Sequence, residues 1–359
     1  MNSFQLYRTW YPCLAQLIPD KCPSRLNNLT WLIVGLYQSL NVHLNAIVRK
    51  WPMAAKNQSL IRRLTRFLDN SAVQVRGWYE PVAKRLLQKF AQGELRLIID
   101  GSKVGWGHQL LVIAIAYHHR ALPLVWTWVK GKRGHSSAKT QLALLKYVHQ
   151  LLPARTRVIL VGDAEFGSIP VIRQLRRWRW FYVLRQKGSH LVRRKGQRGW
   201  QPFSSLVQQP GQMTWWAEAF LTQQWQSSMA LLAYWGEGEK QPWLLATNLP
   251  EARLARQAYQ RRMWIEGMFG DWKGHGFDVE ATRLRHVQRL SRLVLAVCLL
   301  YVWLLATGQR AIRYGQRTIV DRVDRRDLSL FRIGWYLIEK LLALQDEFTV
   351  RLYPLVSAS

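Results

Sequence analysis

Apolar positions recur every three or four residues in two stretches near the start of the chain, which is the spacing of amphipathic helices. The first stretch has its apolar residues at Leu60, Ile61, Leu64, Phe67 and Leu68. The basic residues of the two stretches fall on other faces, at Arg62, Arg63, Arg66, Lys84, Arg85 and Lys89. The pattern predicts a helical domain over residues 1–92, whose basic faces are either solvated or in contact with an anionic partner.

After Gly93 the pattern changes to short apolar runs that predict strands. These runs lie at residues 95–100, 110–117, 122–129, 157–162 and 180–185. A helical pattern over residues 137–152 precedes the fourth run, and a shorter helix precedes the fifth. Three antiparallel strands followed by alternating helix and strand predict an α/β domain, with a mixed sheet flanked by helices.

Residues 186–242 are rich in Gly, Gln, Ser and Trp and carry short strand-like stretches, which predicts a β-rich insertion within the α/β domain. A strand over residues 243–248 follows, then a long helix over residues 251–273 and a buried helix over residues 287–306. We therefore expect three parts in the chain: residues 1–92, residues 93–310 with the insertion, and a helical segment over residues 311–359.

The charge of the chain is strongly positive. Its 359 residues include 52 Lys and Arg against 21 Asp and Glu, a formal net charge of +31. A surface this cationic repels itself unless it meets a polyanion, so nucleic acid or an anionic membrane is the expected partner. The 19 Trp residues could fill a core or stack on bases.

Three features argue against a membrane-spanning or secreted protein. The longest apolar run, from Leu293 to Ala306, has 14 residues and follows Arg292, whereas a membrane span needs about 20. The first 18 residues lack the pattern of a signal peptide. The three cysteines are too few and too scattered for a disulfide framework or a zinc site. We expect a cytoplasmic protein whose partner is nucleic acid and not a membrane.

Three acidic residues stand out in a chain with few acids. Asp100 and Asp163 each end an apolar strand, and Glu266 lies in the helix after the insertion. Ligands gather at strand ends in α/β sheets, although a single Asp there is also a common turn or cap residue. A carboxylate cluster needs a cation, and oxygen ligands favour Mg²⁺ or Mn²⁺. Two such ions could activate a water or a 3′-hydroxyl and stabilise the leaving oxygen of a phosphodiester.

Polar residues surround Glu266 at helical intervals. Tyr259, Arg262, Glu266 and Lys273 are spaced by three, four and seven residues, which would place all four on one face of a continuous helix. Such a face suits a phosphodiester-cleaving site, because the acid can bind metal while the donors hold backbone phosphates. The alternative is an ordinary surface ion pair between Arg262 and Glu266.

These motifs resemble the insertion-sequence-4 family of bacterial DDE transposases. The resemblance lies in the Tyr259-x2-Arg262-x3-Glu266-x6-Lys273 signature. It extends to Leu-Ile-Ile-Asp100-Gly-Ser, to Leu-Val-Gly-Asp163-Ala-Glu-Phe-Gly and to Pro-Trp243-Leu-Leu-Ala-Thr-Asn, and it covers about residues 93–285 in the expected order. The resemblance implies an RNase H-like fold in which Asp100, Asp163 and Glu266 bind the metal ions, two of Mg²⁺ or Mn²⁺.

The resemblance also implies roles in DNA binding. Tyr259, Arg262 and Lys273 would contact phosphates around the cleaved end of the transposon. Trp243 matches by position an aromatic residue that stacks on a flipped base in family members that form hairpins. The alternative for Trp243 is a core residue beside Leu244. Residues 1–92 would then be a DNA-binding domain and residues 93–310 the catalytic domain.

The function that the resemblance implies is cut-and-paste transposition of an insertion sequence. The protein would act as a homodimer on terminal inverted repeats and target DNA, in the bacterial cytoplasm and in association with the nucleoid. Two alternatives remain open at this point. One is an RNase H-like nuclease or resolvase without strand transfer, and the other is a domesticated derivative that only binds DNA.

Overall fold

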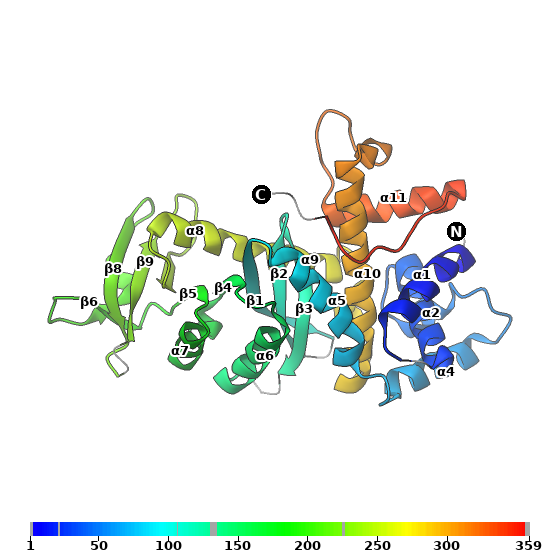
Figure 1. The fold of residues 1–359 in the computed structure, drawn as a ribbon, viewed down its shortest axis with the longest axis horizontal. Helices are drawn as coiled ribbons and strands as arrows, with labels where there is room; N and C mark the ends of the chain where they lie inside the picture. The colour runs from blue at the N-terminus through cyan, green and yellow to red at the C-terminus, as the bar shows by residue number, and fades with distance from the viewer. Residues whose placement is uncertain (1–2, 21, 106, 130–134, 225–226, 356–359) are drawn as a thin grey trace. The chain divides into compact units, whose positions relative to one another are not determined.

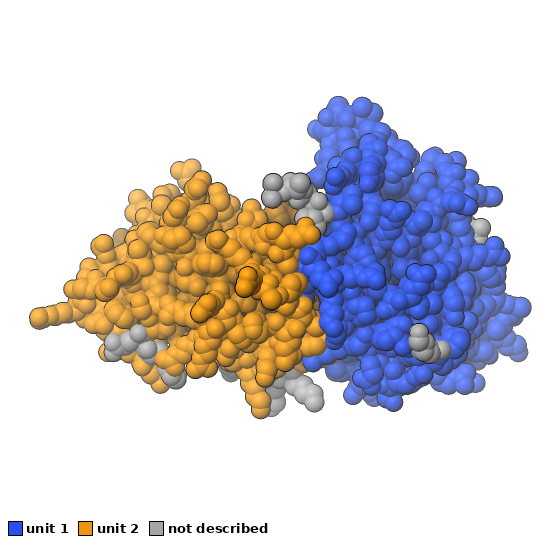
Figure 2. Space-filling model, viewed as in Figure 1, with its two compact units in different colours: residues 1–89, 102–109, 268–359 blue, residues 90–101, 110–267 orange. Residues whose placement is uncertain are grey.

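The structure, a computed structural model, describes residues 3–20, 22–105, 107–129, 135–224 and 227–355. The chain forms two units, which Figure 2 shows in different colours. Unit 1 consists of residues 1–89, 102–109 and 268–359, and unit 2 consists of residues 90–101 and 110–267. Each unit therefore combines segments that are distant in the sequence.

Apolar runs of unit 2 form the centre of a mixed ten-stranded sheet (Figure 1). The strands are β1 (Glu94–Val104), β2 (His108–Tyr117), β3 (Arg120–Val129), β4 (Arg157–Gly162), β5 (Phe181–Arg185), β6 (Leu191–Arg194), β7 (Gln201–Pro202), β8 (Met213–Leu221), β9 (Ser227–Tyr234) and β10 (Trp243–Thr247). Their order is β3-β2-β1-β4-β5-β10-β9-β8-β6-β7. Because β1 to β3 follow one another through short turns, they are antiparallel, whereas β4 runs parallel to β1 and to β5.

The predicted insertion continues this sheet. β6, β7, β8 and β9 pair with one another in antiparallel fashion. β10 returns between β9 and β5 and is antiparallel to both. The residues of β9 from Met229 to Ala233 are all buried, so apolar side chains on both faces of this strand pack into the unit.

Helices connect the parallel strands of the sheet and pack against it. α6 (Ala138–Leu151) joins β3 to β4, α7 (Ile169–Arg177) joins β4 to β5, and α6 packs against α7 and β3. The Ser137 hydroxyl caps α6 by accepting from the Thr140 amide at 3.2 Å. After β10, α8 (Ala252–Gln260) packs against β4 and β5 (Figure 1). α8 thus brings the segment after the insertion back to the two central parallel strands.

Unit 1 is helical and joins the two ends of the chain. It contains α1 (Ser3–Leu17), α2 (Pro23–Ser39), α3 (Leu44–Val48), α4 (Asn57–Asp69), α5 (Val75–Phe90), α10 (Val287–Arg313) and α11 (Leu330–Leu344). Aromatic rings join these helices in the core, since Trp10 lies 5.2 Å from Trp303 and Tyr37 lies 5.1 Å from Trp335. The predicted basic face of α4 differs in one residue: Arg63 donates to Asn28 Oδ1 at 2.7 Å and so packs inside the unit.

α10 is the central helix of unit 1. It has 27 residues and is long and apolar enough to cross a membrane, but 89% of its most apolar window is buried inside the protein, which fits a core helix. Arg292 near its start is buried and donates to the carbonyl oxygens of Leu68 and Val73. α11 crosses α10 so closely that a Cβ on Gly334 would lie 2.0 Å from the Leu304 carbonyl oxygen, so this crossing requires glycine.

The α/β class predicted from the sequence is confirmed, with its mixed sheet, flanking helices, β-rich insertion and N-terminal helical region. The strand order β3-β2-β1-β4-β5 agrees with the RNase H-like fold that the resemblance implies. One predicted element is wrong, because residues 251–273 do not form a continuous helix. A 3₁₀ turn over residues 261–263 separates α8 from α9 (Trp264–Trp272).

Candidate active site

Asp100 and Asp163 lie side by side because their strands are adjacent and parallel. In the register of β1 and β4, Ile99 is opposite Gly162, and each aspartate is the next residue of its chain. Close packing at this point requires Gly162, since a Cβ there would lie 2.8 Å from Ile99 Cγ2. Asp100 Oδ1 accepts from the next backbone N–H at 2.8 Å, and Asp163 Oδ1 does the same at 2.7 Å. One oxygen of each carboxylate thus orients it.

Arg262 connects Asp100 with Glu266. Its Nη1 donates to Asp100 Oδ2 at 3.0 Å, and its Nη2 donates to Glu266 Oε1 at 2.7 Å. The side chain of Arg262 is 11% exposed, that of Asp100 is 18% exposed and that of Glu266 is 49% exposed. The 3₁₀ turn that interrupts the predicted helix carries Arg262, whereas Glu266 lies in the first turn of α9. The guanidinium therefore bridges two carboxylates from different parts of the fold.

The electrostatics of the site favour a cation. The pKa of Asp100 is raised to about 6, mainly by burial and also by the charges of Asp163 and Glu266, against a lowering by Arg262 and the Gly101 N–H. Burial alone would lower the pKa of Arg262, but its acidic neighbours, Tyr259 and Asp100 foremost, outweigh burial and raise it. The site thus places a permanent positive charge where carboxylates converge.

Tyr259 and Trp243 pack together beside this cluster. The ring of Tyr259 is buried in α8, and the ring of Trp243, at the start of β10, lies 5.1 Å from it at an angle of 65°. Trp243 also contacts Tyr234 of β9 edge-to-face at 5.7 Å and is half-buried. Burial raises the pKa of Tyr259 to about 12, with a further rise from Asp163 against a lowering by Arg262. Tyr259 is therefore a neutral, inward-facing phenol.

The structure corrects the prediction that Tyr259, Arg262, Glu266 and Lys273 share one face of a continuous helix. Tyr259, near the end of α8, is buried and keeps a contact with Arg262, whose guanidinium lies 5.9 Å from the ring centroid, whereas Glu266 lies beyond the 3₁₀ turn in α9. Lys273 follows the end of α9, belongs to unit 1 and forms an ion pair with Glu280 of the same unit at 2.7 Å. Arg262 and Glu266 keep the predicted i,i+4 pairing. A spacing argument assumes one continuous helix, and the 3₁₀ turn removes that assumption.

The kind of ligand at the site fits a hard divalent cation. Asp100, Asp163 and Glu266 supply only carboxylate oxygens, which are ligands that Mg²⁺ and Mn²⁺ prefer. In the part of the chain that the structure describes, no three His, Cys, Asp or Glu side chains are grouped as a ready-made metal site. Arg262 pairs with oxygens of two of the three carboxylates, and its Nε is buried with no acceptor among the described residues. The carboxylate oxygens therefore suit such a cation, while in this structure the guanidinium of Arg262 pairs with Asp100 and Glu266.

A family model described as "Transposase DDE domain" matches residues 91–303. The chain belongs to this transposase family. The match begins before β1 and ends within α10, so it includes both aspartates, the insertion and Glu266. The DDE transposase identity inferred from the sequence motifs is confirmed at this level.

This DDE transposase is also similar to a solved structure of another transposase. The structure titled "Cryo-EM structure of piggyBac transposase synaptic complex with hairpin DNA" is similar to it with a TM-score of 0.47 and 10% sequence identity. That similarity covers 99% of this chain and 84% of the piggyBac chain. No curated protein matches the chain significantly.

A pocket beside Asp163 contains polar residues of the DDE domain that the sequence motifs did not single out. The cavity measures about 670 Å³, and its lining includes His135, Glu165, Lys187 and His190. Glu165 Oε1 accepts from the Ser136 amide at 2.6 Å and from the Ser136 hydroxyl. Glu165 could have been singled out because it lies two residues after Asp163, but no spacing reveals its hydrogen bond with Ser136, 29 residues earlier in the chain.

Proposed function

We propose that this transposase excises an insertion sequence and joins it to target DNA by a cut-and-paste route. Water would attack first to nick the DNA at a terminal inverted repeat. The freed 3′-hydroxyl would then attack the opposite strand or the target. Both steps are in-line displacements at phosphorus, so one site can perform them in succession. Membership of the DDE family supports the transposase activity, and the route is our inference.

The observation that carries the proposal is that Asp163 lies beside Asp100, which Arg262 links to Glu266. Adjacent parallel strands bring the two aspartates together. The guanidinium of Arg262 donates to Asp100, 162 residues away in the sequence, and to Glu266, 4 residues away. Burial and mutual repulsion raise the pKa of Asp100, which indicates a carboxylate held for a positive partner. Structural turn residues have no need of such an arrangement.

Asp100, Asp163 and Glu266 would hold two Mg²⁺ or Mn²⁺ ions, whose chemistry here is to activate the attacking oxygen and stabilise the leaving one. Arg262 would pass from the carboxylates to a non-bridging oxygen of the scissile phosphate, for which a guanidinium is well suited. The ring of Tyr259 lies 5.1 Å from that of Trp243 and would hold it in place. Lys273 would contact a phosphate of the flanking DNA, and Trp243 would stack on a base extruded from the transposon end.

The expected partners are double-stranded DNA of the terminal repeats and of the target, bound by a homodimer. The net charge of +31 supports this assignment, because phosphate neutralisation supplies much of the affinity of such complexes. We place the protein in the bacterial cytoplasm, in association with the nucleoid. The helical region of residues 1–92 would bind DNA, and residues 93–310 would carry out the chemistry.

The test is strand cleavage of a labelled duplex that carries the DNA flanking this gene. We expect nicking by the wild-type protein with Mg²⁺, and loss of nicking with retained DNA binding in Asp100→Asn, Asp163→Asn and Glu266→Gln. Each amide keeps the shape of the side chain but removes the charge that holds the metal. Nicking by Asp163→Asn at close to the wild-type rate would remove the three acids from the active site.

A target duplex in the same reaction distinguishes the two alternatives. A nuclease or resolvase would nick the labelled duplex but would leave its 3′ end unjoined to the target. A domesticated DNA-binding derivative would bind the duplex without nicking it. A joined product that forms with the wild-type protein and is absent with Glu266→Gln would exclude both alternatives.

A further inference from the structure

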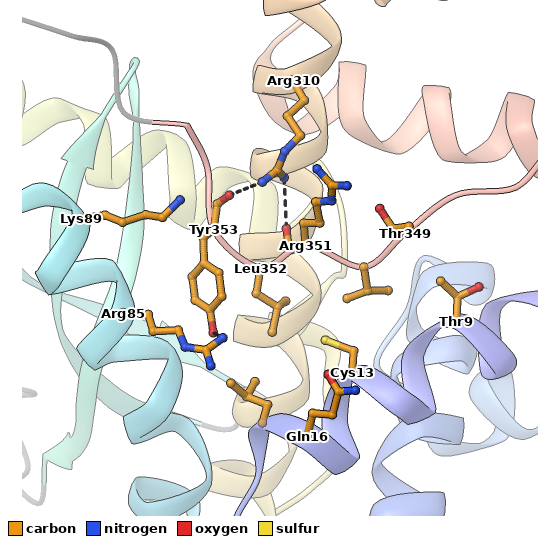
Figure 3. A pocket seen from close by; sticks show the side chains of 12 residues that line it. Thr9, Cys13, Gln16, Arg85, Lys89, Arg310, Thr349, Arg351, Leu352 and Tyr353 are labelled. Atoms are coloured by element: carbon orange, nitrogen blue, oxygen red, sulfur yellow. Dashed lines mark hydrogen bonds between the residues drawn. The ribbon is translucent and has the colours of Figure 1, made fainter.

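Unit 1 contains a pocket that the transposition chemistry does not explain (Figure 3). Its volume is about 420 Å³, within the usual range of ligand sites. Helices α1, α5 and α10 line it together with the extended segment of residues 349–353. All of its lining residues belong to unit 1, whereas Asp100, Asp163 and Glu266 belong to unit 2.

Four basic side chains line this pocket: Arg85, Lys89, Arg310 and Arg351. Arg85 and Lys89 lie one helical turn apart on α5, and Arg310 lies near the end of α10. Among the described lining residues none is acidic. The other polar groups are uncharged in their common form, such as the hydroxyl of Thr9 and the amide of Gln16. The lining therefore offers hydrogen-bond donors and positive charge to whatever enters.

The ring of Tyr353 positions two of these cations. The guanidinium of Arg85 lies 5.3 Å from the ring centroid, and Arg85 Nη1 donates to the Tyr353 hydroxyl at 3.4 Å. The ammonium of Lys89 lies 5.9 Å from the same ring. Figure 3 shows Tyr353 between the two side chains. A ring face holds cations without neutralising them, so their charge stays available to an anion.

Arg310 fixes the segment that carries Tyr353. It donates to the carbonyl oxygen of Tyr353 at 2.6 Å and to that of Arg351 at 3.3 Å (Figure 3). Arg310 thus orders the wall of the pocket.

The crowding of cations is unfavourable without an anion. Burial lowers the pKa of Lys89, and the charge of Arg310 lowers it further. Cys13 also lines the pocket, and its burial raises the pKa of its thiol to about 11, against a lowering by Arg85, so this thiol carries no charge at neutral pH. Like charges held this close repel each other more strongly near a protein surface than in bulk water.

We propose that this pocket binds a backbone phosphate of DNA. The inference rests on the proposed function, because it takes the DNA on which the transposase acts as the source of the phosphate. A phosphodiester carries one negative charge on two free oxygens, which matches paired guanidinium and ammonium donors. Arg85 and Arg351 are exposed at the rim, so a polymer can reach the pocket without entering it completely.

Lysine footprinting tests the site directly. The protein is acetylated with an N-hydroxysuccinimide ester, with and without a mixed-sequence duplex, and each lysine is quantified by mass spectrometry. At a DNA concentration ten times the dissociation constant, we expect acetylation of Lys89 to slow about tenfold by mass action. Lys340 of α11 is the control, since it is exposed in the same unit, does not line the pocket and lies outside residues 1–92. Equal protection of the two lysines would overturn the proposal.

A pair of double variants tests the contribution to affinity. Lys89→Gln with Arg351→Gln removes two charges from the pocket, and Arg326→Gln with Lys340→Gln removes two exposed charges elsewhere in unit 1, outside residues 1–92. We expect the pocket variant to bind duplex DNA about tenfold more weakly than the control variant, and its salt slope to be shallower by about one. Thermal melting establishes that both variants fold. Equal affinities in the two folded variants would overturn the proposal.

Two further arms separate the possible failures. Inorganic phosphate replaces DNA in the first, and protection of Lys89 by phosphate at the DNA-equivalent concentration would assign the pocket to a free anion and overturn the DNA assignment. The second is the nicking assay with wild-type protein. Nicking without selective protection of Lys89 would overturn this inference alone, whereas a wild-type protein that binds no DNA would overturn the proposed function and the inference together.

Discussion

Asp100 is the residue whose protonation links the site to stability. Its folded pKa of about 6 lies above the ordinary value of 3.8, so the folded state binds a proton more tightly than the unfolded state. Stability from this group is therefore present below about pH 4 and is lost as pH rises to about 6. A metal ion would reverse the preference, because it binds only the ionised carboxylate.

We predict the corresponding pH dependence for metal-free protein. The free energy of unfolding of the wild type, relative to Asp100→Asn, should fall by at most about 3 kcal/mol as pH rises from 4 to 6, and should stay level above pH 7. Denaturant unfolding of both proteins in chelator at several pH values measures the difference. A difference that grows with pH over this range would mean that the pKa of Asp100 is lowered and not raised.

Arg262 acts through its shape as well as its charge. Its two terminal nitrogens reach two different carboxylates, which one ammonium cannot do with the same geometry. We predict that Arg262→Lys keeps much of the thermal stability in chelator but lowers nicking about a hundredfold, because a misplaced phosphate reacts slowly. Arg262→Gln should lose both. Nicking by Arg262→Lys at the wild-type rate would show that charge alone suffices.

At the residue scale, the sequence singled out individual residues but did not predict how their side chains pair. The two aspartates were recognisable because each ends an apolar run. The bond from Arg262 to Asp100 spans 162 residues, and no local pattern contains it. The ion pair of Lys273 with Glu280 was equally invisible, since it depends on the turn after α9.

Between elements, the contact of β10 with α8 decides the position of Trp243. Its ring is half-buried between Tyr234 and Tyr259, so one part packs and another remains accessible. A residue of this kind can support the fold and still stack on a base. The two alternatives left by the sequence are therefore compatible with each other, and they differ in what the loss of the ring impairs.

We predict that Trp243→Ala nicks DNA normally but forms hairpins or later products poorly, because only the later step needs a flipped base, whose unstacking costs a few kcal/mol. Trp243→Phe, which retains a ring, is the control and should recover the later step. Nicking, hairpin formation and thermal melting are measured on one preparation of each variant. A uniform loss of all activities with a lower melting temperature would assign Trp243 to the core alone.

Strands and most helices were predictable at this scale, and the break between α8 and α9 was not. Apolar runs identify β4 to the residue, because a buried parallel strand is apolar throughout. Residues 251–273 have helical periodicity on both sides of the break, and neither Pro nor Gly marks it. The 3₁₀ turn of residues 261–263 contacts β4, so tertiary packing accompanies a change that local propensity does not contain.

The net charge belongs to the whole molecule. With +31 spread over 359 residues, binding to DNA should release many counterions. We predict that the affinity for duplex DNA falls at least about a thousandfold between 50 and 200 mM salt. Gel-shift titrations over this range measure it, with a polyanion-free buffer throughout. An affinity that does not change with salt would contradict the nucleic-acid assignment altogether.

The sequence by itself determined the class of the fold, the approximate positions of the strands outside the insertion, the excess of positive charge and the acids that follow the apolar runs of β1 and β4. These properties are local or compositional, so a single stretch of chain or a count of residues contains them. Tertiary structure alone decided that Arg262 bridges Asp100 and Glu266, that the insertion extends the central sheet, and that α5, α10 and residues 349–353 enclose a basic pocket. Each of these depends on contacts between residues far apart in the chain, whose pairing is set by how whole elements pack and not by any spacing along the sequence.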